Sequence, residues 1–196
     1  MKDLITERIF EMQATLKEWD ESDNLDLQNI TRTISTAFAS GNKLLICGNG
    51  GSAADASHLA AEFVCSFRRD LKRPGFPAIA LSSDNAVLTA YSNDFDFSLI
   101  FARQVEAFAK PGDVLLVIST SGNSLNCIKA AESANALGIP TLALTSNHGS
   151  LANIVGHSLK VRSKNTQIIQ QCHQIAYHLI AELVEEEMIN ILKNRG

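Results

Sequence analysis

Short apolar segments alternate with helical segments over residues 43–161, and this alternation constrains the fold more than any other feature of the chain. The central short segments are apolar at nearly every position, a pattern typical of parallel strands that are buried on both faces. The segments in between have helical length and composition. We therefore expect an α/β fold: a three-layer α-β-α sandwich with a mostly parallel central sheet. Its strands are predicted at 43–47, 77–81, 113–118, 141–144 and 157–161.

Helices are expected on both sides of this alternating region. Apolar residues recur at heptad-like spacings of four and three in the opening segment, at Ile5, Ile9, Met12, Leu16 and Trp19. A second helix is expected over about 27–38, and the tail from 167 to 192 reads as one long helix. The whole chain, 1–196, is predicted to be a single domain, with 1–40 as an N-terminal helical segment. The apolar stripe of that segment packs either on its own domain or in an oligomer.

Bulk composition excludes some classes of function. The formal net charge of −4 disfavours a nucleic-acid partner, which would call for a basic surface. No apolar run reaches the length of about 18 residues that a membrane span requires, and the charged start is unlike a signal peptide. We therefore expect a cytoplasmic protein with no membrane partner. The four cysteines are scattered without a CxxC motif, which indicates reduced, buried thiols.

The first candidate site is a glycine-rich turn between a strand and a helix, Gly48-Asn49-Gly50-Gly51-Ser52. Glycines allow the backbone to approach a ligand closely, and a helix N-terminus offers free amides to an anion. Ser52 could instead serve only as a helix N-cap. The spacing Gly48-x-Gly50-x-x-Ala53 also fits a loose dinucleotide fingerprint. However, the strand that should end in an acidic residue ends in Ala80-Leu81-Ser82-Ser83.

The second candidate site is the hydroxyl-rich turn Ser119-Thr120-Ser121-Gly122-Asn123-Ser124. Hydroxyls and exposed amides before a helix can hold a phosphate group. The absence of a lysine after the glycine excludes a nucleoside-triphosphate loop. A helix cap needs a single hydroxyl, and this turn has four, so we favour phosphate binding.

Polar residues at metal-ligand spacing lie on two predicted helices. His58 and Glu62 are four residues apart, on one helix face, and Glu62 lies among apolar neighbours. A partly desolvated carboxylate there suits a general base. Gln170 and His178 share a stripe on the last helix, and together with His58 and Glu62 they could form a zinc site. Spacing alone does not show that the two helices meet.

Three further polar segments have simpler interpretations. Asn93-Asp94 can be a plain turn, although Asp94 could reach a sugar hydroxyl. The charged loop 68–75 is expected to be exposed, and Glu185-Glu186-Glu187 is expected to face solvent.

Taken together, these motifs resemble those of a known family. The residues that carry the resemblance are 47–52, Asp55, His58, Glu62, Arg73-Pro74-Gly75, Asn93-Asp94-Phe95, 112–116, 118–124, Ile169-Gln170, His173 and His178. Their order and spacing are similar to those of the phosphoheptose isomerases of the sugar isomerase (SIS) domain family. The resemblance covers essentially the whole chain.

The resemblance implies an activity and a set of site residues. The reaction would convert sedoheptulose 7-phosphate to D-glycero-D-manno-heptose 7-phosphate through an enediol, for the heptose of lipopolysaccharide core. Glu62 and His178 would be catalytic, and His58, Glu62, Gln170 and His178 would bind one zinc ion per subunit. Active sites would lie between the subunits of a homotetramer. Substrate contacts would fall on Asn49, Gly50, Gly51, Ser52, Glu62, Asn93, Asp94, Ser119, Thr120, Ser121, Ser124 and Gln170.

The resemblance has departures and rivals. Family members often carry an arginine one turn beyond the catalytic carboxylate, where this chain has Ser66, so either Arg68 or Arg69 could replace it. Gln167 also stands where some relatives have an acidic residue. The family includes a non-catalytic adaptor that associates with a replication initiator, and its pattern lacks a glutamate at the position of Glu62. A sugar-phosphate sensor without turnover is a second alternative.

Overall fold

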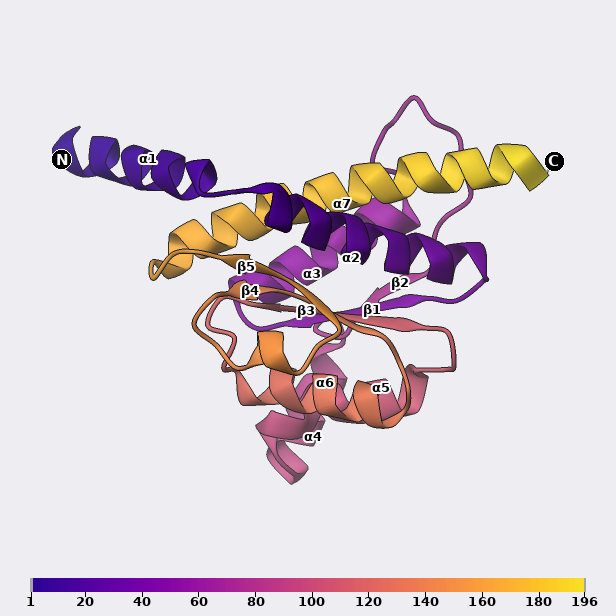
Figure 1. The fold of residues 1–196 in the computed structure, drawn as a ribbon. Coiled ribbons are helices and arrows are strands. Elements are labelled where there is room, and N and C mark those ends of the chain that lie inside the picture. The colour runs from indigo at the N-terminus through magenta and orange to yellow at the C-terminus, as the bar shows by residue number, and fades with distance from the viewer. Residues whose placement is uncertain (1, 196) are drawn as a thin grey trace.

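A five-stranded, wholly parallel sheet forms the centre of the computed structural model, which describes residues 2–195 (Figure 1). The strands lie in the order β2-β1-β3-β4-β5. The predicted α/β sandwich with a mostly parallel sheet is therefore confirmed. The strands are β1 (Leu44–Gly48), β2 (Ala78–Ala80), β3 (Val114–Ser119), β4 (Thr141–Ser146) and β5 (His157–Val161).

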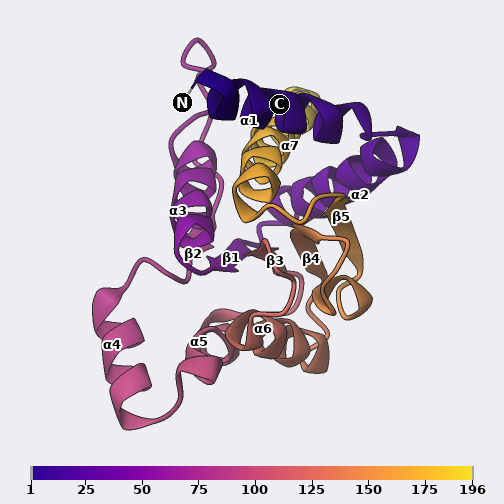
Figure 2. The ribbon, with the colours of Figure 1, turned by 90° about the vertical axis from the view of Figure 1, so that its left-hand side faces the viewer.

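Helices cover both faces of this sheet (Figure 2). One layer contains α2 (Glu21–Ala39), α3 (Gly51–Val64) and α7 (Thr166–Arg195), with α1 (Lys2–Lys17) lying over α7. The other layer contains α5 (Ile100–Phe108) and α6 (Leu125–Ala136). The helix α4 (Asn85–Asp94) and the short 3-10 segment η1 (Phe97–Leu99) lead into α5, and the 3-10 segment η2 (Leu151–Asn153) follows β4.

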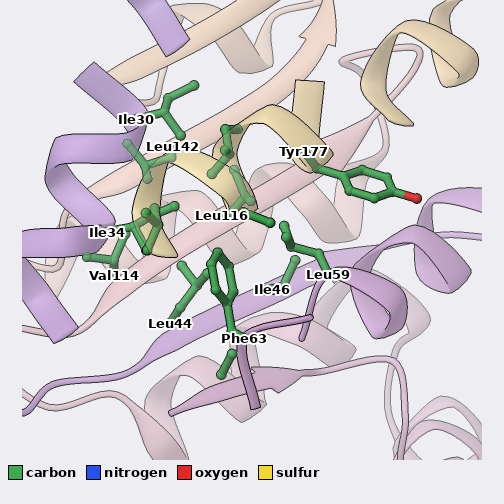
Figure 3. Close-up of a cluster of buried hydrophobic side chains, with 14 of the residues drawn as sticks. Ile30, Ile34, Leu44, Ile46, Leu59, Phe63, Val114, Leu116, Leu142 and Tyr177 are labelled. Atoms are coloured by element: carbon green, nitrogen blue, oxygen red, sulfur yellow. The ribbon is translucent and has the colours of Figure 1, made fainter. Parts of the chain in front are cut away.

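Alternate strand residues belong to two separate cores, which explains why the strands are apolar throughout. Leu44 and Ile46 pack with the α2, α3 and α7 layer, where Phe63 and Tyr177 are also buried (Figure 3). Leu45 packs in the core beneath α5 and α6. Each fully buried large apolar side chain stabilises the fold by about 1.5–3 kcal/mol. The hydroxyl of Tyr177 points away from this cluster (Figure 3) and interacts with Asp55 of α3.

Helix α2 begins at Glu21, six residues before the start predicted from apolar periodicity. Asp20 caps it, because its side chain accepts hydrogen bonds from the amides of Ser22 and Asp23 at 2.8 and 3.2 Å. The Asp23 carboxylate accepts from the Asp20 amide at 3.0 Å, which completes a capping box. The first turn is polar, so periodicity alone could not detect it.

The apolar stripe of α1 is divided between two environments. Met12 and Leu16 pack against buried residues of β5 and α7. Ile5 and Ile9 remain 59% and 53% exposed. The stripe thus packs partly on its own domain and leaves an apolar end uncovered.

No helix in the described part of the chain combines the length and the apolar character needed to cross a bilayer.

Candidate active site

The two polar turns lie side by side at the carboxyl edge of the sheet. Strands β1 and β3 are neighbours, with Gly48 in register with Ile118, and β2 lies on the other side of β1. The strand order therefore changes direction between β1 and β3. Such a switch point is where doubly wound sheets bind ligands.

The first turn is held close to β3 and to α6. A Cβ atom on Gly48 would come within 2.7 Å of the Ser52 carbonyl oxygen and 2.8 Å of that of Ile118, so only glycine fits there. The side chains of Asn49 and Asn126 exchange amide hydrogen bonds of 2.8 and 2.9 Å. Because Asn126 lies in the first turn of α6, this pair joins the two candidate loops directly.

The second turn keeps its hydroxyls at the start of α6. Ser119 is buried at the end of β3, and its hydroxyl lies 3.4 Å from that of Ser124. Ser124 occupies the N-cap position without making a side-chain cap bond. The hydroxyl of Ser121, which is exposed, accepts a 3.1 Å hydrogen bond from the Asn123 amide. Thr120 is half-buried. The turn therefore presents hydroxyls and free helix amides together, as an anion site requires.

Helices α3 and α7 lie against each other and run in the same direction. The Asp55 carboxylate near the start of α3 accepts hydrogen bonds from Gln170 and Gln174, at 2.9 and 3.2 Å. Further along, His58 lies against Tyr177 and His178, with ring centroids 5.7 and 5.2 Å apart. The two helices thus form one continuous polar seam that starts at the first turn.

His58, Glu62 and His178 come together on this seam. Their ligand atoms all lie within 4.8 Å of one another, and His58 Nε2 is 3.0 Å from Glu62 Oε1. The side chain of His58 is 49% exposed and that of Glu62 is 23% exposed. Two imidazoles and one carboxylate match the donor set of catalytic zinc sites, which leave one position open. The cluster therefore offers both a base and a place for a cation.

Gln170 lies at the beginning of this seam, beside the first turn. Its amide nitrogen donates to Asp55, and a Cβ atom on Gly51 would lie 2.6 Å from its amide oxygen. His178 follows eight residues later on α7, about 12 Å along the helix axis. Gln170 thus contacts the loop that contains Gly50, Gly51 and the buried Ser52, while the other three proposed ligands form the cluster.

Asn93 and Asp94 lie at the end of α4, away from the seam. Both are exposed, and the Asn93 amide donates to the Asp94 carboxylate at 2.8 Å. Helix α4 contacts α5 and η1 and has no buried residue (Figure 2). Within one chain, Asn93 and Asp94 therefore do not lie with the other candidate site residues of the described structure.

Sequence reasoning assigned no site role to two members of the seam, Asp55 and Tyr177. Asp55 shares the face of α3 that carries His58 and Glu62, at spacings of three and seven, which was the available signal. Burial raises the pKa of Tyr177 to about 12, with the charges of Asp55 and Glu62 adding to the effect. The phenol therefore stays neutral beside the carboxylates.

Two expectations about charged residues were wrong in part, although Glu186, Glu187 and most of the loop 68–75 are exposed as expected. Glu185 does not face solvent: its side chain is fully buried and pairs with Arg73, whose own side chain is 1% exposed. The loop 68–75 is therefore not exposed throughout. A run of charged residues in the sequence gives no sign that one of them, Glu185, is buried, because its partner Arg73 lies more than a hundred residues away.

Comparisons with known proteins agree with this geometry. A model of the SIS domain matches residues 9–146, so the chain belongs to the SIS domain family. The phosphoheptose isomerase of Crocosphaera subtropica is 52% identical over 163 residues, which cover 83% of this chain and 82% of the relative. That of Thermodesulfovibrio yellowstonii is 45% identical, covering 94% and 92%. Within the SIS domain family, the chain falls among the phosphoheptose isomerases.

A solved structure gives the same result. The phosphoheptose isomerase from Francisella tularensis superposes with a TM-score of 0.88 at 33% identity, over 94% of this chain and 97% of that one. The resemblance inferred from the motifs is confirmed, and the catalytic interpretation is favoured over the adaptor.

Proposed function

We propose that this chain is a sugar-phosphate isomerase that converts sedoheptulose 7-phosphate to D-glycero-D-manno-heptose 7-phosphate. The observation that carries the proposal is the cluster of His58, Glu62 and His178 on a seam that begins at the switch-point loops. Relatives named phosphoheptose isomerase share most of the chain's length. In a bacterium that makes lipopolysaccharide, the product would serve core heptose synthesis.

The phosphate would bind at residues 119–124, where hydroxyls and the N-terminus of α6 favour an anion. This anchoring fixes the far end of the sugar and positions the reacting carbons. Ser52 and Glu62 are ten residues apart on α3, about 15 Å along its axis. A sugar phosphate with its phosphate at the turns and its reacting carbons near Glu62 would therefore lie extended along the seam.

Glu62 would act as the base of an enediol mechanism. It removes a proton from C1, beside the C2 ketone, and electrons shift to form the C1–C2 double bond as the C2 oxygen gains a proton. Return of a proton to C2 and loss of the C1 hydroxyl proton give the aldose. His178 would protonate the carbonyl oxygen or steady its developing charge.

Zinc fits the same cluster. His58, Glu62 and His178 would hold it, with one ion per subunit, and Gln170 would join only if its amide turned from Asp55. Bound zinc polarises carbonyl and hydroxyl oxygens of a substrate. His178 cannot shuttle a proton through a nitrogen that binds metal, so its roles as ligand and as acid exclude each other at that atom.

The chain would form a homotetramer with active sites between its subunits, so that a partner subunit would complete each site. Helix α4 buries none of its residues, and Phe95 and Phe97 beside it are 71% and 56% exposed. The apolar end of α1 is also uncovered. A partner subunit that covered these surfaces could bring its own Asn93 and Asp94 to the seam of its neighbour.

The direct test is conversion of sedoheptulose 7-phosphate by the purified protein, followed by product detection. Turnover is expected. Binding without turnover would favour the sensor, and neither binding nor turnover would favour the adaptor.

A further inference from the structure

A buried ion pair lies next to the candidate site and has no part in the mechanism above. Arg73 Nε donates to Glu185 Oε1 at 2.6 Å, with both side chains at most 1% exposed. The Glu185 carboxylate also accepts from the amides of Phe67 and Arg68, each at 3.1 Å. Burying two charges is costly unless their hydrogen bonds are satisfied, and here the carboxylate is both paired and hydrogen-bonded.

The guanidinium group of Arg73 also holds the end of α3. Its Nη2 donates to the carbonyl oxygen of Glu62 at 2.9 Å, and its Nη1 donates to that of Phe63 at 2.9 Å. The last four carbonyls of a helix have no partner within the helix. Arg73 thus caps the helix at the backbone of the residue that carries the catalytic carboxylate.

Glu185 fixes the other helix of the seam. It lies seven residues after His178 on α7, and seven residues are close to two helical turns, so both face α3. The pair therefore joins two points: the end of α3, where Glu62 lies, and the turn of α7 that lies two turns beyond His178.

Other contacts prevent Arg73 from leaving this position. Its guanidinium carbon lies 4.1 Å from the centroid of the Phe76 ring. A Cβ atom on Gly75 would approach the Val64 carbonyl oxygen to 2.7 Å, so glycine lets the loop wrap closely around the helix end. Burial alone would raise the pKa of the Glu185 carboxyl, but hydrogen bonds from Arg73 and the loop amides outweigh it and lower the pKa. The pair is therefore charged at neutral pH.

We propose that Arg73 and Glu185 form a positioning unit, which sets the location of the Glu62 carboxylate relative to His178 by clamping the end of α3 onto α7. The proposal rests on the proposed isomerase function. Neither residue needs to touch the substrate. Arg73 acts through the Glu62 and Phe63 carbonyls, and Glu185 acts through Arg73.

The decisive variant is Arg73→Lys. Lysine keeps the charge opposite Glu185, but a point-like ammonium cannot reproduce the planar fork that grips two carbonyls and a carboxylate together. We expect kcat to fall about ten- to a hundredfold, the scale of misplacing a catalytic group by about 1 Å, with KM little changed. Amide hydrogen exchange should also become faster in the segment 62–68.

A double variant addresses the risk of misfolding. Arg73→Met with Glu185→Leu removes both charges and keeps apolar volume, a replacement that buried ion pairs often tolerate. It should fold, and it should show the same selective loss of kcat. The matched control is Lys43→Met with Asp113→Leu. That pair also contains a buried carboxylate, but it lies at the opposite edge of the sheet, where its loss should leave kcat unchanged.

The outcomes separate the two proposals. An active wild type with reduced kcat in both Arg73 variants and normal kcat in the control supports the positioning unit. Wild-type kcat in Arg73→Lys, or a loss of kcat as large in the control, overturns it while leaving the isomerase intact. An inactive wild type overturns the proposed function itself, and the positioning unit with it.

Discussion

The Oε1 atom of Glu62 lies 3.0 Å from Nε2 of His58, one helical turn away on α3. This contact fixes the direction of the carboxylate along the seam. It also leaves the second carboxylate oxygen available to a substrate or a cation.

Replacing Glu62 by Gln should abolish most turnover. The substitution keeps the shape of the side chain but removes the base, and general-base catalysis contributes about 10²–10⁴-fold. Steady-state kinetics with sedoheptulose 7-phosphate would measure the loss. Glu187→Gln, at an exposed position of α7, is the control. Near-normal turnover of Glu62→Gln would reject the assignment.

Metal analysis should find about one zinc per chain, as expected for a site with two imidazoles and one carboxylate. His58→Ala and His178→Ala should each lose that zinc, because a ligand is removed. His148→Ala should keep it, since the imidazole of His148 contacts the Ser163 carbonyl oxygen instead. Equal zinc content in all three variants would argue against the cluster as a metal site.

Gly122→Ala should weaken phosphate binding. Gly122 has a φ of 62°, and a Cβ atom there would meet the Thr145 hydroxyl at 2.7 Å and the Gly149 Cα at 2.9 Å. Gly138→Ala is a matched control, because its φ is 69° but its Cβ would meet nothing within 4 Å. Both variants should lose about 1–2 kcal/mol of unfolding free energy from the left-handed backbone. Only Gly122→Ala should raise KM, and equal KM values would contradict the prediction.

His173 predicts a dependence of stability on pH. Burial lowers the pKa of its imidazole to about 4, although a hydrogen bond to the Thr145 carbonyl opposes the shift. The folded state therefore holds His173 neutral, and its contribution is complete above the ordinary pKa near 6.5 and is lost as the pH falls towards 4. The difference between the pKa values of the unfolded and folded states corresponds to about 3 kcal/mol of unfolding free energy.

Urea denaturation at several pH values checks this dependence. His173→Gln keeps a donor for the Thr145 carbonyl but cannot titrate, so its unfolding free energy should fall less between pH 6.5 and 4. Parallel curves for the two proteins would show that His173 does not contribute.

Assembly should depend on the uncovered end of α1. Ile5→Asp with Ile9→Asp places charges on a surface that is more than half exposed in one chain. Light scattering should give a mass of about four times 21.3 kDa for the wild type and a smaller particle for the variant. Leu137→Asp, at the exposed end of α6, should not change the mass. A wild-type monomer would contradict the tetramer.

The sequence predicts the architecture well because each element carries its own signal. Strand β5 agrees with its predicted bounds, and α7 agrees to within three residues. Boundaries set by side-chain caps or distant partners were less accurate. Helix α3 is an example: helical spacing alone sets no end for it, and it ends at Val64, where Arg73 holds the carbonyls of Glu62 and Phe63.

For the site, too, local features were predicted better than contacts between distant segments. Helical spacing placed His58 and Glu62 on one face, but nothing in that spacing could show that His178 would meet them. Glu185 shows the limit most clearly. Its burial depends on Arg73, 112 residues earlier in the chain, and on backbone amides that have no signature in the sequence.

The parallel course of α3 and α7 restricts how the chain can change in length. An insertion or deletion of one residue inside a helix rotates everything beyond it by about 100°. Within α7, such a change between Gln170 and Glu185 would move one contact with α3 off the seam while the other stayed. Within α7, viable length variants should therefore be confined to its end after Glu185, and the stretch from Gln170 to Glu185 should keep a constant length.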